Sequence, residues 1–345
     1  MAIERNSMKY FKGSFIFTAI GLILAYLWAH KAAPGHEIAS LFVVVVLSIL
    51  EVSLSFDNAV VNAVKLEKMP PVWQHRFLTW GIWVSVFGMR FLFPLLVVSI
   101  FAKLNLFSVL NMAINSPDNY THYLEITHPM VITFGASFLI MLFFTYFINP
   151  KKEIHWLKPI ESRLCALSEI NGLNVILTIV LLFFFNRFVV YEYRHDALIA
   201  GIWGIIVFVL IEFLSSLLEN KEDKALNLEH FGLINFLYLE LIDASFSLDG
   251  VLGAFALSRD ILIITIGLSI GAMFVRSLTV MLVEKKTLKQ YVYLEHGAHW
   301  AIGALALIMF ISSFREVSEI ITGLSGLAFI GAAFICSILK NNKKE

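Results

Sequence analysis

Residues 41–64 read LFVVVVLSILEVSLSFDNAVVNAV, an apolar run that is long enough to cross a bilayer as a helix. Glu51 lies close to the middle of this run, and Asp57 follows six residues later. A charged side chain at the bilayer centre costs roughly 2.5–3.5 kcal/mol on insertion scales, so it needs a cation, a proton or an opposite charge nearby. The stretch therefore indicates a membrane protein with a polar site inside the membrane.

The composition of the whole chain supports the same class. Of its 345 residues, 59% are hydrophobic and 15% are charged, against ~45–50% and about 25% in soluble domains. The net charge is zero, so no basic excess exists for binding nucleic acid, and the expected surroundings are the lipid bilayer. The two cysteines, Cys165 and Cys336, lack CxxC spacing, which excludes a disulfide framework and a zinc ribbon.

Stretches of about 20 apolar residues predict an all-α, polytopic bundle of about ten transmembrane helices. With a cytoplasmic N-terminus, 18 of the 26 Lys and Arg residues fall in inner segments and 5 in outer ones, which places both termini in the cytoplasm. The longest loops are expected at 102–128 and 149–171. The predicted spans are 14–30, 38–64, 77–101, 129–148, 172–191, 197–218, 231–257, 260–283, 299–314 and 318–339.

A second motif repeats the first, since residues 243–250 (DASFSLDG) align with residues 51–58 (EVSLSFDN). The next predicted helix carries an arginine in both copies, Arg90 and Arg276. Copies offset by five helices have opposite orientations, so we predict two inverted repeats with a site near the midplane where they meet. The single membrane domain then divides into repeat 1 (38–148), an inner loop with connecting helices (149–230), inverted repeat 2 (231–314), and a C-terminal helix with a basic tail (315–345).

A regular helix turns by about 100° per residue, so it cannot aim both acids of one motif at the same ion. Two alternatives remain: two separate ion sites, or a helix that is locally unwound at the motif. Gly250 would ease such a break in the second copy. The side chains that share one stripe are Glu51, Ser55, Asn58 and Asn62 in the first copy, and Glu240, Asp243, Ser247 and Gly250 in the second.

Carboxylate, hydroxyl and amide oxygens are hard donors that suit Mn²⁺, Ca²⁺ or Mg²⁺. Neither motif contains His or Cys, which speaks against zinc and copper. Arg90 and Arg276 are candidate counter-charges that replace the ion. Glu240 is a candidate addition to the site or a proton carrier, with Ser55 and Ser247 as further candidate ligands. His296 and His299, near an inner helix start, are expected to form a surface cluster.

At these residues the chain resembles the TerC-like integral membrane proteins. The run from Glu51 to Ala59 is similar to the signature of that family, and Asp243 to Gly250 with LEHGAHWAIGALA at 294–306 resembles its long-chain branch. The resemblance implies a LysE-superfamily type fold and efflux of a divalent metal, chiefly Mn²⁺, across the inner (plasma) membrane. The metal ligands that it implies are Glu51, Asp57 and Asn58, with Asp243 and Asp249 as their partners.

The expected function is therefore divalent cation transport, with proton exchange as a hypothesis. Ca²⁺ is the closest rival ion, because it accepts the same oxygen donors. A membrane scaffold in a metal or tellurite stress response is the non-transport alternative. An intramembrane metalloenzyme would need a dedicated ligand set and a nucleophile that the motifs lack, so we expect no enzyme. The sequence leaves the oligomeric state open.

Overall fold

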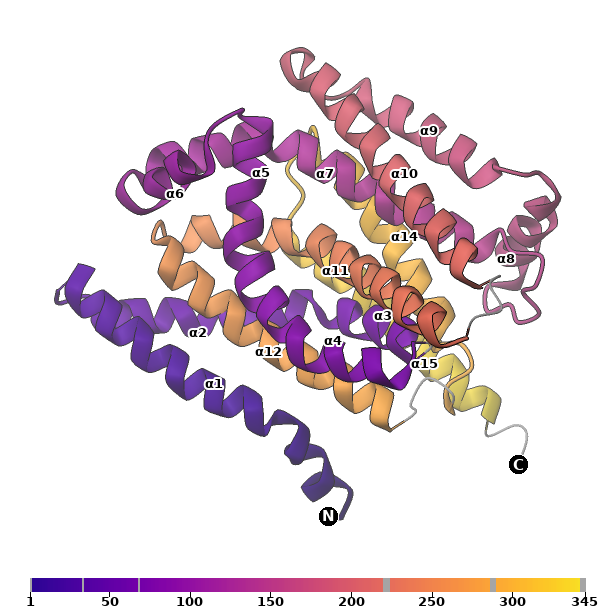
Figure 1. Ribbon diagram of the computed structural model, residues 1–345, viewed down its shortest axis with the longest axis horizontal. Coiled ribbons are helices and arrows are strands. Elements are labelled where there is room, and N and C mark those ends of the chain that lie inside the picture. Colours follow the sequence, from indigo (N-terminus) through magenta and orange to yellow (C-terminus); the bar gives the residue numbers. More distant parts are fainter. Residues whose placement is uncertain (1, 33, 68, 220–223, 286–289, 342–345) are drawn as a thin grey trace. The chain divides into compact units, whose positions relative to one another are not determined.

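The computed structural model describes residues 2–32, 34–67, 69–219, 224–285 and 290–341, and this part of the chain is all-α with no strand. The helices are α1 (Ala2–Ala32), α2 (Glu37–Leu54), α3 (Phe56–Glu67), α4 (Pro71–Trp83), the π-helix η1 (Val84–Leu92), α5 (Phe93–Phe101), α6 (Leu106–Asn115), α7 (Pro117–Phe147), α8 (Lys158–Ala166), the 3₁₀ helix η2 (Leu167–Glu169), α9 (Leu173–Asn186), α10 (Tyr191–Glu219), α11 (Lys224–Leu257), α12 (Ile261–Glu284), α14 (Leu294–Ser312) and α15 (Glu319–Asn341). Figure 1 labels most of these elements.

Eight helices in the described ranges are long and apolar enough to cross a membrane, which confirms a polytopic membrane protein. A ninth is added if α8–η2 and α9, which meet at 114°, are one broken span. These eight or nine spans of the described residues stand beside an expected count of about ten. The stretch predicted at 231–257 does form a helix, α11, but α11 is not among these spans. Its interior carries the acidic residues Glu240 and Asp243.

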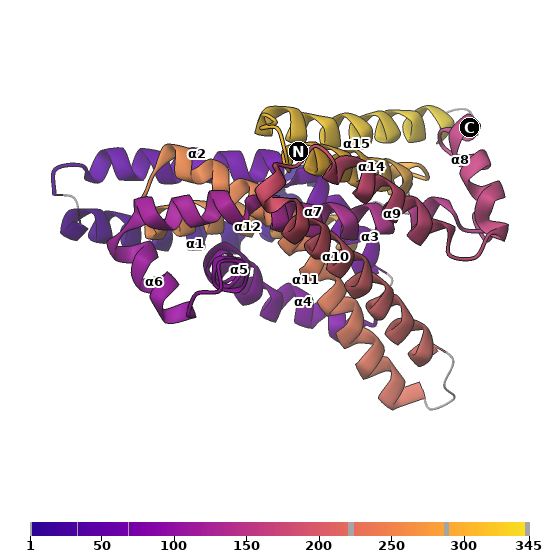
Figure 2. The same cartoon turned by 90° about the horizontal axis from the view of Figure 1, so that it is seen from above.

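The chain divides into two compact units, and unit 1 comprises residues 1–127 and 239–285. Helix α12 is its centre: it packs against α1 and α2 and also contacts α3, α4 and η1. Both views show α1, α2 and α12 running side by side (Figures 1 and 2). A Cβ on Gly267 of α12 would lie 2.7 Å from the Cβ of Leu47, so a small residue here lets α2 approach closely, as in many membrane helix pairs.

The second predicted span is interrupted inside its motif. Helix α2 ends at Leu54, α3 begins at Phe56, and Ser55 lies between them with φ −103° and ψ 17°. Local unwinding at the motif therefore occurs in the first copy. The second copy has no break at Gly250, the residue that would ease one, because α11 continues through it to Leu257. A Cβ on Gly250 would lie 3.3 Å from Glu51 Oε2, so the glycine gives room to a neighbouring side chain.

Unit 2 comprises residues 128–238 and 286–345. In it α14 packs along α15 and contacts α9, which in turn packs against α10; α14 and α15 lie side by side in Figure 2. A Cβ on Gly297 would lie 2.5 Å from the Cβ of Ala333, so this pair is also closely packed.

The two segments predicted as the longest loops are partly helical. The stretch 102–128 contains α6 and the first turns of α7, and the stretch 149–171 contains α8 and η2. The side chain of Asn105 caps α6 by accepting a hydrogen bond from Phe107 N at 2.9 Å. These helices are too short or too polar to register as apolar runs of membrane-spanning length, which is why the hydropathy pattern does not reveal them.

Candidate functional site

Two acidic side chains at equivalent positions of the two motifs meet inside unit 1. Glu51 lies in the last turn of α2 and is 4% exposed, and Asp243 lies in α11 and is 7% exposed. Both form ion pairs with the guanidinium of Arg90, which is 3% exposed. Arg90 Nη2 donates to Glu51 Oε1, and Arg90 Nη1 lies 3.4 Å from Asp243 Oδ2. One guanidinium thus bridges the motif acids of both copies.

The π-helix η1 sets the position of Arg90. In a π-helix the backbone bonds join residues five apart, so residues i and i+5 lie on adjacent turns. Arg90 Nη1 accordingly donates to the backbone oxygen and to Oγ of Ser85, at 3.3 and 3.2 Å. Ser85 Oγ also donates to Asp243 Oδ2 at 3.2 Å, so this hydroxyl joins the arginine to the carboxylate.

Two further polar side chains complete what we call the central cluster. Asn58 Nδ2 donates to Asp243 Oδ1, and Ser55 Oγ donates to Glu51 Oε1 at 3.0 Å. Asn58 is 1% exposed and Ser55 is 7% exposed. The members of the central cluster are Glu51, Ser55, Asn58, Ser85, Arg90 and Asp243, and they come from α2, α3, η1, α11 and the break between α2 and α3.

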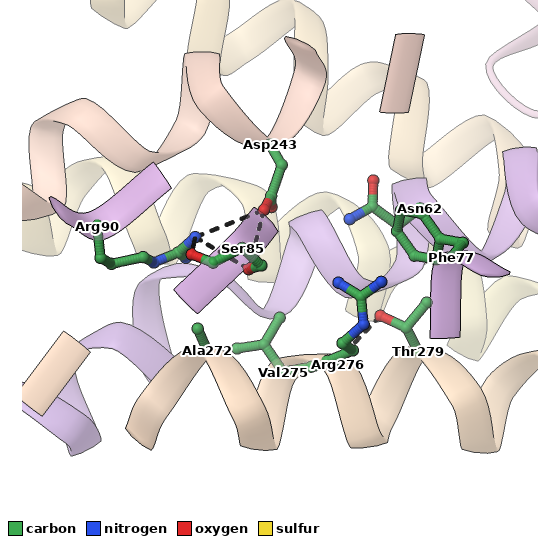
Figure 3. A pocket seen from close by; sticks show the side chains of 9 residues that line it. All are labelled: Asn62, Phe77, Ser85, Arg90, Asp243, Ala272, Val275, Arg276 and Thr279. Carbon is green, nitrogen blue, oxygen red and sulfur yellow. Dashed lines mark hydrogen bonds and ion pairs between the residues drawn. The ribbon is translucent and has the colours of Figure 1, made fainter. Parts of the chain in front are cut away.

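A pocket beside the central cluster contains a second arginine. Its lining includes Asp243, Arg90 and Ser85 from the cluster, together with Asn62 of α3 and Arg276 of α12. It holds about 270 Å³ of atom-free space, counting the part open to solvent. Figure 3 shows the guanidinium of Arg276 pointing from α12 into this space, while dashed lines join Arg90 and Ser85 to Asp243.

Arg276 and Glu240 are buried next to each other without the hydrogen bonds that satisfy the central cluster. Within the described residues, Nε and Nη2 of Arg276 and both carboxylate oxygens of Glu240 have no hydrogen-bond partner. The guanidinium carbon of Arg276 lies 4.2 Å from the centre of the Phe77 ring. A Cβ on Gly81 would meet Arg276 Nη2 and would lie 3.1 Å from Glu240 Oε1, so the glycine makes room for both.

Residues 56–344 match the family described as "Protein of unknown function (DUF475)". The chain belongs to the DUF475 family. No curated protein and no solved structure matches it. The match begins at Phe56, directly after the break in the first motif, and it includes the second motif and both arginines. A likeness to TerC-like proteins stays a prediction for this DUF475 protein.

The structure of this DUF475 protein brings most of the predicted site residues into one region. Glu51, Asn58 and Asp243 are in the central cluster with Ser55 and Arg90, while Glu240 and Arg276 lie beside the pocket. The side chains of Asp57, Ser247 and Asp249 lie outside the described part of the structure. Sequence reasoning missed Ser85. Its spacing of five from Arg90 becomes informative only once a π-helix is known to form there.

The atoms of the central cluster that could bind a metal ion are oxygens. Its other polar atoms are the nitrogens of the Arg90 guanidinium and of the Asn58 amide. Among the described residues, no group of three or more His, Cys, Asp or Glu side chains is placed to hold a metal ion. Two carboxylates with hydroxyl and amide oxygens suit a hard cation, and Arg90 stands between them. A cation that bound both carboxylates would therefore take the place of the Arg90 guanidinium.

Unit 2 of this DUF475 protein contains another buried carboxylate, Glu161 of α8, which is 0% exposed. Its Oε2 lies 2.8 Å from His296 Nδ1 and accepts from Trp156 N at 2.9 Å, while its Oε1 accepts from Trp300 Nε1 at 3.0 Å and from Leu157 N at 3.2 Å. We call these residues the Glu161 cluster. His296 and His299 are each 4% exposed, so the expected surface cluster is wrong: Glu161 draws α14 into contact with α8.

Proposed function

We propose that the protein transports a divalent metal cation, with Mn²⁺ as the favoured substrate and Ca²⁺ as the rival. The observation that carries the proposal is the bridge between Glu51 and Asp243. Two buried carboxylates from equivalent positions of a repeated motif converge on one counter-charge, the guanidinium of Arg90. Secondary transporters bind their ions at such a meeting point of two repeats.

Charge balance supports exchange between Arg90 and a cation. Each intramembrane carboxylate costs roughly 2.5–3.5 kcal/mol when nothing neutralises it. Arg90 supplies one positive charge to Glu51 and Asp243, whereas a divalent cation would supply two. The guanidinium sits on a long side chain with several rotatable bonds, so it can withdraw without unfolding the helix that carries it.

The donors that surround the carboxylates favour a hard ion. Ser55 and Ser85 place hydroxyl oxygens within 3.2 Å of them, and Asn58, whose amide nitrogen donates to Asp243, carries an amide oxygen on the same group. Mn²⁺, Ca²⁺ and Mg²⁺ accept this oxygen set, while the sequence motifs offer none of the His or Cys ligands that zinc and copper prefer. With the implied resemblance to TerC-like proteins, Mn²⁺ is the favoured substrate.

We further infer export from the cytoplasm across the inner (plasma) membrane, with both termini in the cytoplasm. The inner segments hold most of the Lys and Arg residues, as the positive-inside rule requires. Proton exchange would provide the driving force, and the buried Glu240 is the candidate that carries the proton. No enzymatic role is proposed.

The test is ⁵⁴Mn²⁺ flux into proteoliposomes that contain the purified protein. Glu51→Gln and Asp243→Asn should each lower the flux by at least about 100-fold, because even outer-shell partners of a metal site contribute 10–100-fold. Ser53→Ala is the matched control, since Ser53 lies in the same motif but is exposed and donates only to Ile49 O. Absence of both Mn²⁺ flux and Mn²⁺ binding in the wild type would exclude Mn²⁺, and the same result with Ca²⁺ would exclude transport.

One observation favours the scaffold as the second candidate. Arg90, Ser85 and Asn58 satisfy the two carboxylates with groups of the protein itself, which is also how a purely structural network is built. A scaffold would unfold at the same temperature with and without Mn²⁺. Glu51→Gln would lower that temperature equally in the presence and in the absence of Mn²⁺. A metal-dependent rise in the wild type would exclude it.

A further inference from the structure

The contacts made by the two motif acids follow the alignment of the two copies. Asp243 is contacted by Asn58 and Ser85 of the first copy. The equivalent positions of the second copy are Gly250 and Gly271, and both lie against Glu51: a Cβ on Gly271 would be 2.5 Å from Glu51 Cβ, and one on Gly250 would be 3.3 Å from Glu51 Oε2. Each acid is thus contacted by equivalent positions of the opposite copy. These positions hold polar residues around Asp243 and glycines around Glu51.

The helices that carry the arginines obey the same correspondence. In the second copy Gly267 lies nine residues before Arg276, as Gly81 lies nine before Arg90 in the first. Gly267 O accepts a hydrogen bond from Ser48 Oγ at 3.0 Å. Ser48 is the position equivalent to Glu240, whose Oε1 would lie 3.1 Å from a Cβ on Gly81. The two glycines therefore meet equivalent positions of the opposite motif helix.

The arginines themselves break this correspondence. Arg90 is paired with both Glu51 and Asp243, whereas Arg276 forms no ion pair within 4.0 Å in the described part of the chain. Its Nε and Nη2 have no hydrogen-bond partner there, and the Phe77 ring, Gly81 and Glu240 lie beside the guanidinium. Burying a guanidinium at 7% exposure in this way is unfavourable unless another arrangement of the molecule uses it.

Arg276 also lies within reach of the position that Arg90 occupies. Asp243, Arg90 and Arg276 line the same pocket, and Figure 3 shows the side chains of all three around it. When one repeat rocks against the other, contacts made by one copy pass to the equivalent residues of the other copy. The residue equivalent to Arg90 is Arg276.

We propose that Arg276 is the counter-charge of the opposite-facing state: it neutralises Asp243 and Glu51 there, while Arg90 withdraws. The inference rests on the proposed transport function and deepens it. A carrier without metal crosses between its two states with its carboxylates neutralised by one arginine or the other. A carrier loaded with metal needs neither arginine to cross.

This division of roles separates two kinds of flux. Net ⁵⁴Mn²⁺ uptake requires the carrier to return without metal, whereas ⁵⁴Mn²⁺ exchange against internal unlabelled Mn²⁺ does not. In proteoliposomes, Arg276→Gln should lower net uptake by about 100-fold, the factor that corresponds to one unneutralised intramembrane carboxylate. Exchange should stay within about twofold of wild type, a difference of less than 1 kcal/mol. Arg90→Gln should show the same pattern.

Two further variants keep the test interpretable. Arg276→Lys keeps the positive charge and should recover most of the net uptake. Arg76→Ala is the matched control, because Arg76 also lies over an aromatic ring, 4.6 Å from the centre of Trp73, but does not line the pocket. Its net uptake and exchange should both equal those of the wild type.

Three results would overturn the inference. Equal loss of uptake and exchange in Arg276→Gln, in protein that still elutes as a single folded species, would make Arg276 part of metal binding or packing. Unchanged net uptake would show that protons or another group neutralise the carboxylates. Failure of Arg276→Lys to recover uptake would exclude a charge effect. Failure of the proposed function itself would look different, because the wild type would then show neither uptake nor exchange.

Discussion

The central cluster of unit 1 and the Glu161 cluster of unit 2 both bury carboxylates, but they satisfy them in different ways. Glu161 receives the backbone N–H groups of Trp156 and Leu157, directly before α8, and the indole N–H of Trp300, so its donors belong to the backbone or to a rigid ring. Glu51 and Asp243 instead share the long side chain of Arg90 as their charged partner, and Ser55, Ser85 and Asn58 donate further hydrogen bonds to them. The difference teaches that burial of an acid alone does not indicate a functional site. A buried acid whose charged partner is one long side chain is a better indication, because a ligand can displace that side chain.

The largest expected effect is on the free energy of unfolding and concerns the Glu161 cluster. Glu161→Ala should lower the free energy of unfolding by about 3–5 kcal/mol, since it leaves several buried donors without an acceptor. Chemical denaturation in detergent measures the change. Metal binding by the folded fraction should remain as in the wild type. A loss of binding in folded protein would show that the Glu161 cluster takes part in the transport site.

The next effect is the stabilisation of the central cluster by Mn²⁺. Mn²⁺ at 100 times its dissociation constant should stabilise the wild type by about 2.7 kcal/mol, the value expected for one site. Glu51→Gln and Asp243→Asn should abolish this stabilisation, because each removes a ligand. Thermal unfolding with and without Mn²⁺ measures it, and Ser53→Ala is the control. An equal Mn²⁺ effect in all variants would place the metal elsewhere.

Two glycines that surround Glu51 allow a sharper comparison within the central cluster. Gly271→Ala places its Cβ 2.7 Å from Ser48 O and against the Glu51 stem, which cannot move freely, so it should destabilise by about 1–3 kcal/mol. Gly250→Ala meets only the flexible carboxylate end and should destabilise less. Denaturation of the two variants side by side gives the order. The reverse order would mean that α11, and not α12, fixes the position of Glu51.

The smallest effect is a pH dependence near the Glu161 cluster. Burial lowers the pKa of Lys152 to about 8, and nearby Glu161 offsets this only in part. The unfolded chain therefore binds more protons between pH 8 and 10.5, so this lysine makes the free energy of unfolding rise with pH across that window. Lys152→Met should raise stability at pH 7 by on the order of 1 kcal/mol, and the gain should vanish near the upper end of the window. A gain independent of pH would attribute the effect to packing against the rings of Tyr146 and Phe147, whose centres lie 3.6 and 3.9 Å from Lys152 Nζ.

Much of the architecture could be predicted from periodicity and hydropathy. The membrane class, the helical state of the ten apolar stretches and the convergence of Glu51, Asn58 and Asp243 follow from patterns in the chain. Hydropathy failed at 102–128, which it treated as a loop although α6 lies there. The sequence also did not show that the first copy breaks at Ser55 while α11 continues through Gly250.

The sequence by itself determined which residues are acidic, basic and small, and the repeated spacing placed them at equivalent positions of two apolar helices. It did not determine which arginine pairs with the acids. That choice was made by tertiary structure: η1 turns Arg90 toward Ser85 and Asp243, and α12 holds Arg276 over Phe77. The physical reason is that ion pairing depends on a few ångströms and on which helices approach, and two nearly identical motifs carry no local information about either.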